Sequence, residues 1–310
     1  MTRIGTSDLD VRPLNLGGNV FGWTTDEATS HAVLDAFVEG GGDFIDTADV
    51  YSAWSDGGAG ISETIIGTWL AKSGKRDQVV IATKVAKKAD RAGLGAQNIR
   101  RAVDESLQRL QTDRIDLYWA HEDDRDTPLA ETLGAFDELV TAGKVRAIGA
   151  SNYTGSRLTE ALETSRREGF AGYVAVQNHY NLVEREEYER DALPVAQANG
   201  LASLPYYSLA SGFLTGKYRP GQLAESQRQA SAAAYLDSPR GPRVLEALDE
   251  AAAAHDVDVA TVALAWLRSR PTVVAPIASA RTVEQLPALL ASMELELTAD
   301  ELDALEHASR

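Results

Sequence analysis

Short apolar runs alternate along the chain with longer segments rich in Ala, Leu and Glu. Most of the short runs are apolar along most of their length, which is typical of parallel strands covered on both faces. The longer segments have a helical period, so the alternation predicts repeated βα units. We expect eight strands, at Pro13–Gly18, Asp43–Thr47, Gln78–Lys84, Ile115–His121, Val145–Ser151, Tyr173–Asn178, Leu201–Tyr206 and Val273–Ala278. The expected fold is α/β: a single (β/α)8 TIM barrel domain over residues 1–310.

Several helix ends can be read from the sequence. Thr24–Glu27, Thr282–Gln285 and Thr298–Glu301 each have the form of a capping box, in which a Thr precedes a Glu or Gln by three residues. Pro128 is suited to the first position of a helix, and Gly143 is suited to the position just after its end.

Two segments interrupt the alternation. Residues 55–60 form a Ser- and Gly-rich loop after the second strand, and residues 211–241 form a long excursion after the seventh. Both follow the carboxyl end of a strand, which in a barrel is the face that carries the active site. A doubly wound sheet is the alternative fold, but the first βα turn lacks the Gly-x-Gly-x-x-Gly motif that would bind a dinucleotide there.

The composition limits the remaining possibilities. The chain has 310 residues, of which 44% are hydrophobic, enough for a large core. No apolar run approaches the roughly 18 residues that cross a bilayer, and the first residues lack the apolar stretch of a signal peptide, so we expect a cytoplasmic protein. The absence of cysteine excludes disulfides, thiolate metal ligands and a cysteine nucleophile.

The net charge of −16 argues against nucleic acid and acidic membranes as partners. An anionic cofactor would therefore need a local basic pocket, for which Lys217 and Arg281 are the candidates. The five histidines lack the spacing of a metal cluster, so we expect no metal site. The sequence does not indicate an oligomeric state.

Four polar residues lie at or just after the ends of neighbouring predicted strands: Asp46, Tyr51, Lys84 and His121. Each taken alone has an ordinary structural explanation, such as packing, a turn cap or a solvated side chain. Because strand ends of a barrel meet at one mouth, the four together predict an active site.

The chemistry that these residue types favour is proton donation. A neighbouring ammonium such as that of Lys84 lowers the pKa of a tyrosine, which would make Tyr51 a better proton donor. Asp46 would keep Lys84 charged, and His121 would orient a substrate carbonyl. No side chain supplies a hydride, so a cofactor is required.

Six segments resemble the aldo-keto reductase superfamily, and together they span nearly the whole chain. They are residues 44–51 (FIDTADVY), 82–84 (ATK), 116–121 (DLYWAH), 143–152 (GKVRAIGASN), 177–182 (QNHYNL) and 209–218 (LASGFLTGKY). The resemblance implies a barrel that binds an extended nicotinamide cofactor across its mouth, and a catalytic tetrad of Asp46, Tyr51, Lys84 and His121.

The same resemblance assigns residues to each part of the cofactor. The nicotinamide carboxamide would be held by Ser151, Asn152 and Gln177, and the ring would stack on Tyr206. The pyrophosphate would be wrapped by Leu209, Ser211, Gly212, Leu214 and Lys217. Arg281 and Gln285 would bind the adenine end, and Arg281 would read the 2′-phosphate, which indicates NADPH/NADP+.

The chain departs from the family pattern at three places. Leu289 stands where the family often has an Asn that contacts adenine, and Ala280 replaces the usual Gly before the Arg. Tyr207-Ser208 stands where Ser-Pro is common.

The substrate pocket is expected to be lined by Trp23, Trp54 and Trp119, with Tyr180 as a further candidate. Aromatic walls suit an apolar or aromatic carbonyl compound, or the apolar face of a sugar. We interpret His179 as a residue that packs or that supports the residues around the site, rather than as a catalytic one.

We therefore predict an NADPH-dependent oxidoreductase that reduces a small aldehyde or ketone to an alcohol. The alternative is an NADPH-binding regulatory subunit with little turnover, since fold alone does not decide function. A barrel hydrolase or an aldolase with a Schiff base on Lys84 is a third reading. A short-chain dehydrogenase is excluded, because the Tyr-x-x-x-Lys spacing is missing.

Overall fold

Eight parallel strands form one sheet, in the order β10-β3-β4-β5-β6-β7-β8-β9. They are β3 (Asn15–Gly17), β4 (Phe44–Asp46), β5 (Val80–Val85), β6 (Ile115–Ala120), β7 (Val145–Ser151), β8 (Tyr173–Gln177), β9 (Ala202–Ser203) and β10 (Ile277–Ala278). The sheet closes between β9 and the segment that leads into β10. Ser203 of β9 donates its N–H to the carbonyl of Thr272 (2.7 Å), and the Ser203 carbonyl accepts the N–H of Val274 (3.0 Å). The eight predicted strands and the barrel fold are thereby confirmed.

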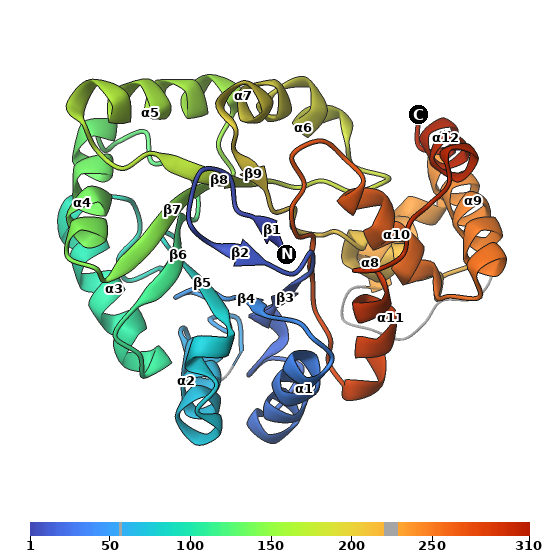
Figure 1. Ribbon diagram of the computed structural model, residues 1–310, viewed down its shortest axis with the longest axis horizontal. Coiled ribbons are helices and arrows are strands. Elements are labelled where there is room, and N and C mark those ends of the chain that lie inside the picture. The colour runs from blue at the N-terminus through green and yellow to red at the C-terminus, as the bar shows by residue number, and fades with distance from the viewer. Residues whose placement is uncertain (56–57, 220–228) are drawn as a thin grey trace.

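The helices lie on the outside of the curled sheet (Figure 1). They are α1 (Glu27–Glu39), α2 (Ile61–Ser73), α3 (Ala96–Leu110), α4 (Leu129–Thr141), α5 (Gly155–Glu168), α6 (Glu186–Arg190), α7 (Ala192–Asn199), α8 (Gln229–Leu236), α9 (Arg240–His255), α10 (Val259–Arg268), α11 (Leu286–Ala291) and α12 (Ala299–Ala308). Short 3-10 helices are η1 (Gly18–Val20), η2 (Arg76–Gln78), η3 (Ala210–Thr215) and η4 (Val283–Gln285).

This computed structural model describes residues 1–55, 58–219 and 229–310. Parts of the two predicted loops, residues 56–57 and 220–228, lie outside the described residues. The described part of the second segment is not simply a loop, since it contains η3, α8 and the start of α9. Within the described ranges, we find no helix with both the length and the apolar character needed to span a membrane.

One of the three predicted capping boxes forms. Thr298 and Glu301 cap α12 reciprocally, as expected. The box predicted from Thr24 is wrong: α1 begins two residues later than predicted, because the Asp26 carboxylate accepts the Thr29 N–H at 2.8 Å and forms the cap. Thr282 precedes only a 3-10 turn and makes no side-chain cap bond.

The ends of α4 differ slightly from the prediction. Pro128 was expected to be the first helical residue, but it is the N-cap residue and the helix begins at Leu129. Gly143 follows the C-cap with a φ of 73°. A left-handed residue after a helix end favours glycine, which explains the stop.

The amino-terminal hairpin closes one end of the barrel. Strands β1 (Thr2–Arg3) and β2 (Asp10–Val11) pair antiparallel and lie across the centre of the ring in Figure 1. Ile4, Leu9 and Val11 are buried in the same apolar cluster as the barrel interior. A side chain at Gly5 would collide with the Val174 carbonyl, because an added Cβ would lie 2.0 Å from that oxygen. The hairpin therefore leaves the opposite end of the barrel for a site.

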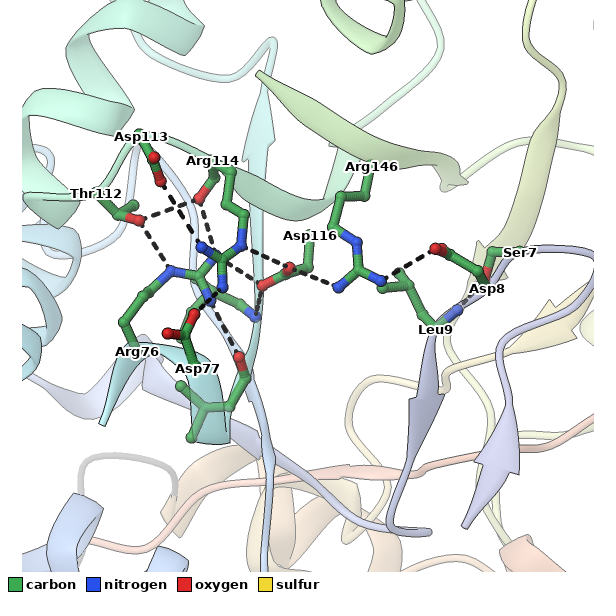
Figure 2. Close-up of polar contacts among 12 residues, drawn as sticks. Ser7, Asp8, Leu9, Arg76, Asp77, Thr112, Asp113, Arg114, Asp116 and Arg146 are labelled. Carbon is green, nitrogen blue, oxygen red and sulfur yellow. Dashed lines mark hydrogen bonds and ion pairs between the residues drawn. The ribbon is translucent and has the colours of Figure 1, made fainter. Parts of the chain in front are cut away.

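A buried carboxylate joins three strands near that closed end (Figure 2). Asp116 of β6 accepts hydrogen bonds from Arg76 (2.8 Å), from the Ile81 N–H of β5 (2.9 Å) and from Arg146 of β7 (3.1 Å). Arg76 also donates to the carbonyl of Val79 (3.0 Å). Asp116 therefore accepts hydrogen bonds from two guanidinium groups and one backbone N–H, and its charge strengthens these bonds.

We expect Asp116→Asn to lower the free energy of unfolding by about 2–4 kcal/mol, because an amide removes the buried carboxylate charge that pairs with the largely buried Arg76 guanidinium. Urea unfolding followed by circular dichroism measures this change. Asp113→Asn is the control, since its side chain is 90% exposed and the change should stay within about 0.5 kcal/mol. Equal effects of the two substitutions would contradict the role given to Asp116.

Candidate active site

The four residues of the predicted tetrad meet at the open end of the barrel. Asp46 is the last residue of β4, Lys84 is the fifth residue of β5, and His121 directly follows β6. Tyr51 lies in the turn after β4, where its N–H bonds to the carbonyl of Ala48 at 3.1 Å. Parallel pairing of β4, β5 and β6 places these side chains on adjacent strands.

Lys84 is the centre of the site. Its side chain is completely buried, and its ammonium donates hydrogen bonds to the Asp46 carboxylate, to the Thr47 carbonyl (2.7 Å) and to the Tyr51 hydroxyl oxygen (3.0 Å). An ammonium has three N–H groups, so all of them are used. This arrangement disfavours the Schiff-base reading, which needs a free neutral amine.

The charge of Lys84 is held by its partners. Burial disfavours the ammonium, but the Asp46 carboxylate and the Tyr51 oxygen outweigh burial and raise the pKa of Lys84. Burial also raises the pKa of Tyr51, while Lys84 acts against that rise. We expected Lys84 to lower the pKa of Tyr51 overall. Lys84 does act to lower this pKa, but the loss of hydration around the phenol is the larger effect, so the overall shift is upward.

His121 lies beside Tyr51 as a neutral imidazole. The two ring centroids are 6.1 Å apart with planes at 75°. Burial, together with the charges of Lys84 and Lys87, lowers the pKa of His121 well below its usual value. Within the described part of the chain, its Nδ1 is buried without a hydrogen-bond partner. A neutral ring offers one N–H donor and one acceptor.

The residues predicted to hold the nicotinamide carboxamide adjoin the tetrad. Gln177 donates to the Asp46 carboxylate at 3.1 Å. Asn152 donates to the carbonyl of His121 (2.9 Å) and to Ser151 Oγ (3.0 Å), and accepts from the Tyr206 hydroxyl (2.7 Å). Donors and acceptors of the kind that an amide needs are thus gathered at one place.

Tyr206 has a ring neighbour on this side of the mouth. Its ring stacks on that of His179, with centroids 5.6 Å apart and planes at 20°. Such a ring contact is of the kind expected for a packing residue, and the non-catalytic role of His179 stays a prediction. The proposed stacking of Tyr206 on a nicotinamide stays a prediction.

The loop predicted to wrap the pyrophosphate has an unusual backbone. Ser211 and Gly212 have φ angles of 57° and 93°, within η3. The N–H groups of Gly212 and Leu214 donate to the Leu209 carbonyl at 2.8 and 3.2 Å. Leu214 is buried and Lys217 is exposed, so Lys217 is the member of the set whose charge is accessible to an anion.

Arg281 and Gln285 lie together after β10. The Gln285 side chain accepts the N–H of Arg281 at 2.8 Å, and both residues are exposed. The α-helix expected to open at Thr282 begins only at Leu286, after the 3-10 turn, so the helix dipole at Arg281 is weaker than expected. Leu289 packs into the core.

Two of the three predicted pocket tryptophans lie at the mouth. The rings of Trp23 and Trp54 are 5.6 Å apart, edge to face, and Trp54 is 6.1 Å from the Tyr51 ring. Trp54 is 50% exposed. Trp119 differs, because it is completely buried in the barrel interior. Its contribution to a pocket stays a prediction.

Some features of the site were not expected from the sequence. The Thr47 carbonyl that accepts from Lys84 belongs to the backbone, so no residue type signals it. Behind the site, buried Glu63 accepts from Thr83 (2.5 Å) and from Arg109 (2.7 Å). Burial and the nearby Glu63 raise the pKa of Asp49 to about 7. Polar residues at the ends of strands were the basis of the sequence prediction, which therefore missed these charged residues between α2, α3 and the strands.

Comparisons with known proteins agree with this architecture. The sequence profile described as "Aldo/keto reductase family" matches residues 13–310. The chain is 38% identical to an uncharacterized oxidoreductase, YrpG, of Bacillus subtilis, over 96% of this chain and 91% of the relative.

Other relatives include the aldo-keto reductase YhdN of Bacillus subtilis, at 36% identity over 93% of this chain and 85% of the relative. Norsolorinic acid reductase B of Aspergillus parasiticus is 31% identical, over 97% of this chain and 82% of the relative. The chain belongs to the aldo/keto reductase family of oxidoreductases.

Proposed function

We propose that this protein reduces an aldehyde or ketone to an alcohol, with NADPH as the hydride source and Tyr51 as the proton donor. The observation that carries this proposal is the direction of one hydrogen bond. Lys84 donates to the Tyr51 oxygen at 3.0 Å, which leaves the phenolic hydrogen available for a substrate oxygen. The word reductase in the names of two relatives supports reduction as the reaction.

Tyr51 would act as the general acid. As the carbonyl carbon is reduced, negative charge develops on its oxygen, and the Tyr51 O–H bond breaks to form the alcohol O–H. The phenolate that remains lies beside the Lys84 ammonium, which stabilises it by charge and hydrogen bonding. Asp46 has no contact with a substrate in this scheme; it keeps Lys84 charged and in place.

His121 would orient the carbonyl. Its pKa lies well below the usual value because of burial and the nearby lysines, so the ring is neutral at physiological pH. A neutral ring can donate one hydrogen bond to the carbonyl oxygen without competing with Tyr51 as an acid.

The donor set fits a nicotinamide dinucleotide. Bound NADPH would supply the hydride that no side chain can provide. Ser151, Asn152 and Gln177 offer the amide and hydroxyl groups that a carboxamide requires. Lys217 and Arg281 offer exposed cations for phosphates in a chain of net charge −16. The forked guanidinium of Arg281 suits a terminal 2′-phosphate.

Replacing Tyr51 by Phe should reduce turnover of an aromatic aldehyde by about a hundredfold to ten-thousandfold, because the proton donor is lost. NADPH binding, followed by fluorescence titration, should stay unchanged. Tyr188→Phe is the control, since the Tyr188 hydroxyl contacts Thr272 Oγ1 at 3.3 Å and lies outside the proposed site. Turnover of Tyr51→Phe within tenfold of the wild type would remove Tyr51 from the role. No turnover by the wild type, with NADPH tightly bound, would favour the regulatory alternative.

The reduction rate should depend little on pH near neutrality. Tyr51 must be protonated, and burial raises its pKa above the ordinary value, so activity is lost only as pH rises through that raised pKa. His121 must be neutral, and burial lowers its pKa, so activity is lost only as pH falls through that lowered pKa. We therefore expect a plateau in kcat/KM between about pH 7 and pH 9. A midpoint inside this range would contradict the assignment.

Arg281→Ala should weaken NADPH binding by about ten- to a hundredfold, because charge-assisted hydrogen bonds to the 2′-phosphate are lost. NADH lacks that phosphate, so its dissociation constant should change far less. Both constants can be measured by fluorescence titration, with Arg167→Ala as the control, since the Arg167 side chain of α5 is exposed. Equal losses for the two cofactors would mean that Arg281 does not read the phosphate.

A further inference from the structure

Tyr207 is a large aromatic residue left half-exposed at the mouth of the barrel. It lies in the segment after β9, next to Tyr206 in the sequence, and it is 47% exposed. Trp54, near Tyr51, is exposed to a similar extent. In the order of the sheet, β4 and β9 are separated by β3 and β10, so the two aromatic side chains extend from different sides of the mouth.

The backbone of Tyr207 is held in a conformation that tyrosine rarely adopts. Its φ is 53°, in the left-handed region that costs a residue with a Cβ free energy. Its carbonyl accepts from the buried Asn181 side chain (2.9 Å) and from the Ala210 N–H (2.7 Å). The Asn181 oxygen in turn accepts the N–H of Val183 at 2.9 Å. Strain that the surroundings maintain in this way is concentrated at ligand sites.

The ring of Tyr207 is supported by other rings. It lies 5.3 Å from His179 and 5.3 Å from Tyr206, with planes at 64° and 63°. Its neighbour Tyr206 donates a hydrogen bond to Asn152 at 2.7 Å, and Asn152 donates to the carbonyl of His121 at 2.9 Å. Tyr207 is therefore linked to the tetrad through Tyr206 and Asn152.

Trp54 forms the other wall. Its ring lies 6.1 Å from Tyr51 and is supported edge-on by Trp23 at 5.6 Å. Half-exposed rings thus lie on two sides of the mouth: Trp54 next to Tyr51 in the loop after β4, and Tyr207 next to Tyr206 in the segment after β9. Two such supported rings favour a flat, polarisable ligand over a puckered one, because aromatic rings gain from stacked and edge contacts.

We propose that Tyr207 is a specificity-determining residue that selects substrates whose carbonyl group is attached to a planar aromatic ring. The aromatic ring binds against Tyr207 and Trp54, with the carbonyl directed at Tyr51. This inference rests on the proposed carbonyl reduction. Because Ser-Pro is common where this chain has Tyr207-Ser208, the wall is a property of this chain rather than of the family pattern.

The test compares benzaldehyde with cyclohexanecarbaldehyde, which match in carbon number but differ in planarity. We expect Tyr207→Ser to lower the ratio of the two kcat/KM values by about three- to tenfold, the size of one aromatic contact. The loss should be mainly in KM for benzaldehyde. Tyr207→Phe keeps the ring and the same backbone constraint, so it should keep the ratio. Thermal unfolding followed by circular dichroism shows whether each variant is folded.

The outcomes separate this inference from the proposed function. If the wild type reduces both aldehydes and Tyr207→Ser leaves their ratio unchanged, the specificity role is wrong while carbonyl reduction stands. A ratio that falls equally in Tyr207→Phe and Tyr207→Ser would also overturn it, because the hydroxyl rather than the ring would then be responsible. If the wild type reduces neither aldehyde, the proposed function itself fails.

Discussion

The ammonium group of Lys84 is completely buried, and three acceptors make this possible. A buried charge without partners would cost more free energy than a domain of this size can spare. Asp46 supplies the opposite charge, the Thr47 carbonyl takes the second N–H, and the Tyr51 oxygen takes the third. The phenol is therefore fixed by the same bond that would stabilise its anion. The position of the substrate oxygen, the role of His121 and the place of a cofactor all depend on this arrangement.

The barrel keeps its two ends chemically distinct. At the amino-terminal end, the hairpin fills the opening with Ile4, Leu9 and Val11, and Asp116 ties three strands together. At the other end, polar side chains converge instead on Lys84 and Asp46. The closed end is apolar inside, while Tyr207 and Ser211, two residues with a left-handed backbone, lie in loops at the end that carries the proposed chemistry.

Much of this could be predicted from the sequence, because strand positions and the meeting of strand ends follow from local pattern and barrel topology. The meeting of the four tetrad residues belongs to that class, whereas the hydrogen bond from Gln177 to Asp46 was not predicted. Features that depend on distant neighbours could not be predicted. Asp26 rather than Thr24 caps α1, Trp119 is buried inside the barrel, and burial outweighs Lys84 in setting the direction of the Tyr51 pKa. Tyr207 was visible only as a departure from a family pattern, and its strained backbone and ring contacts required the fold.

Product analysis tests the central claim most directly. Purified protein would be incubated with NADPH and benzaldehyde, and NADP+ and benzyl alcohol would both be quantified by chromatography. The proposed reaction predicts that the two products form in equal amounts, one alcohol for each NADPH oxidised. NADPH that stays bound and unoxidised, or that is oxidised without formation of the alcohol, would contradict it.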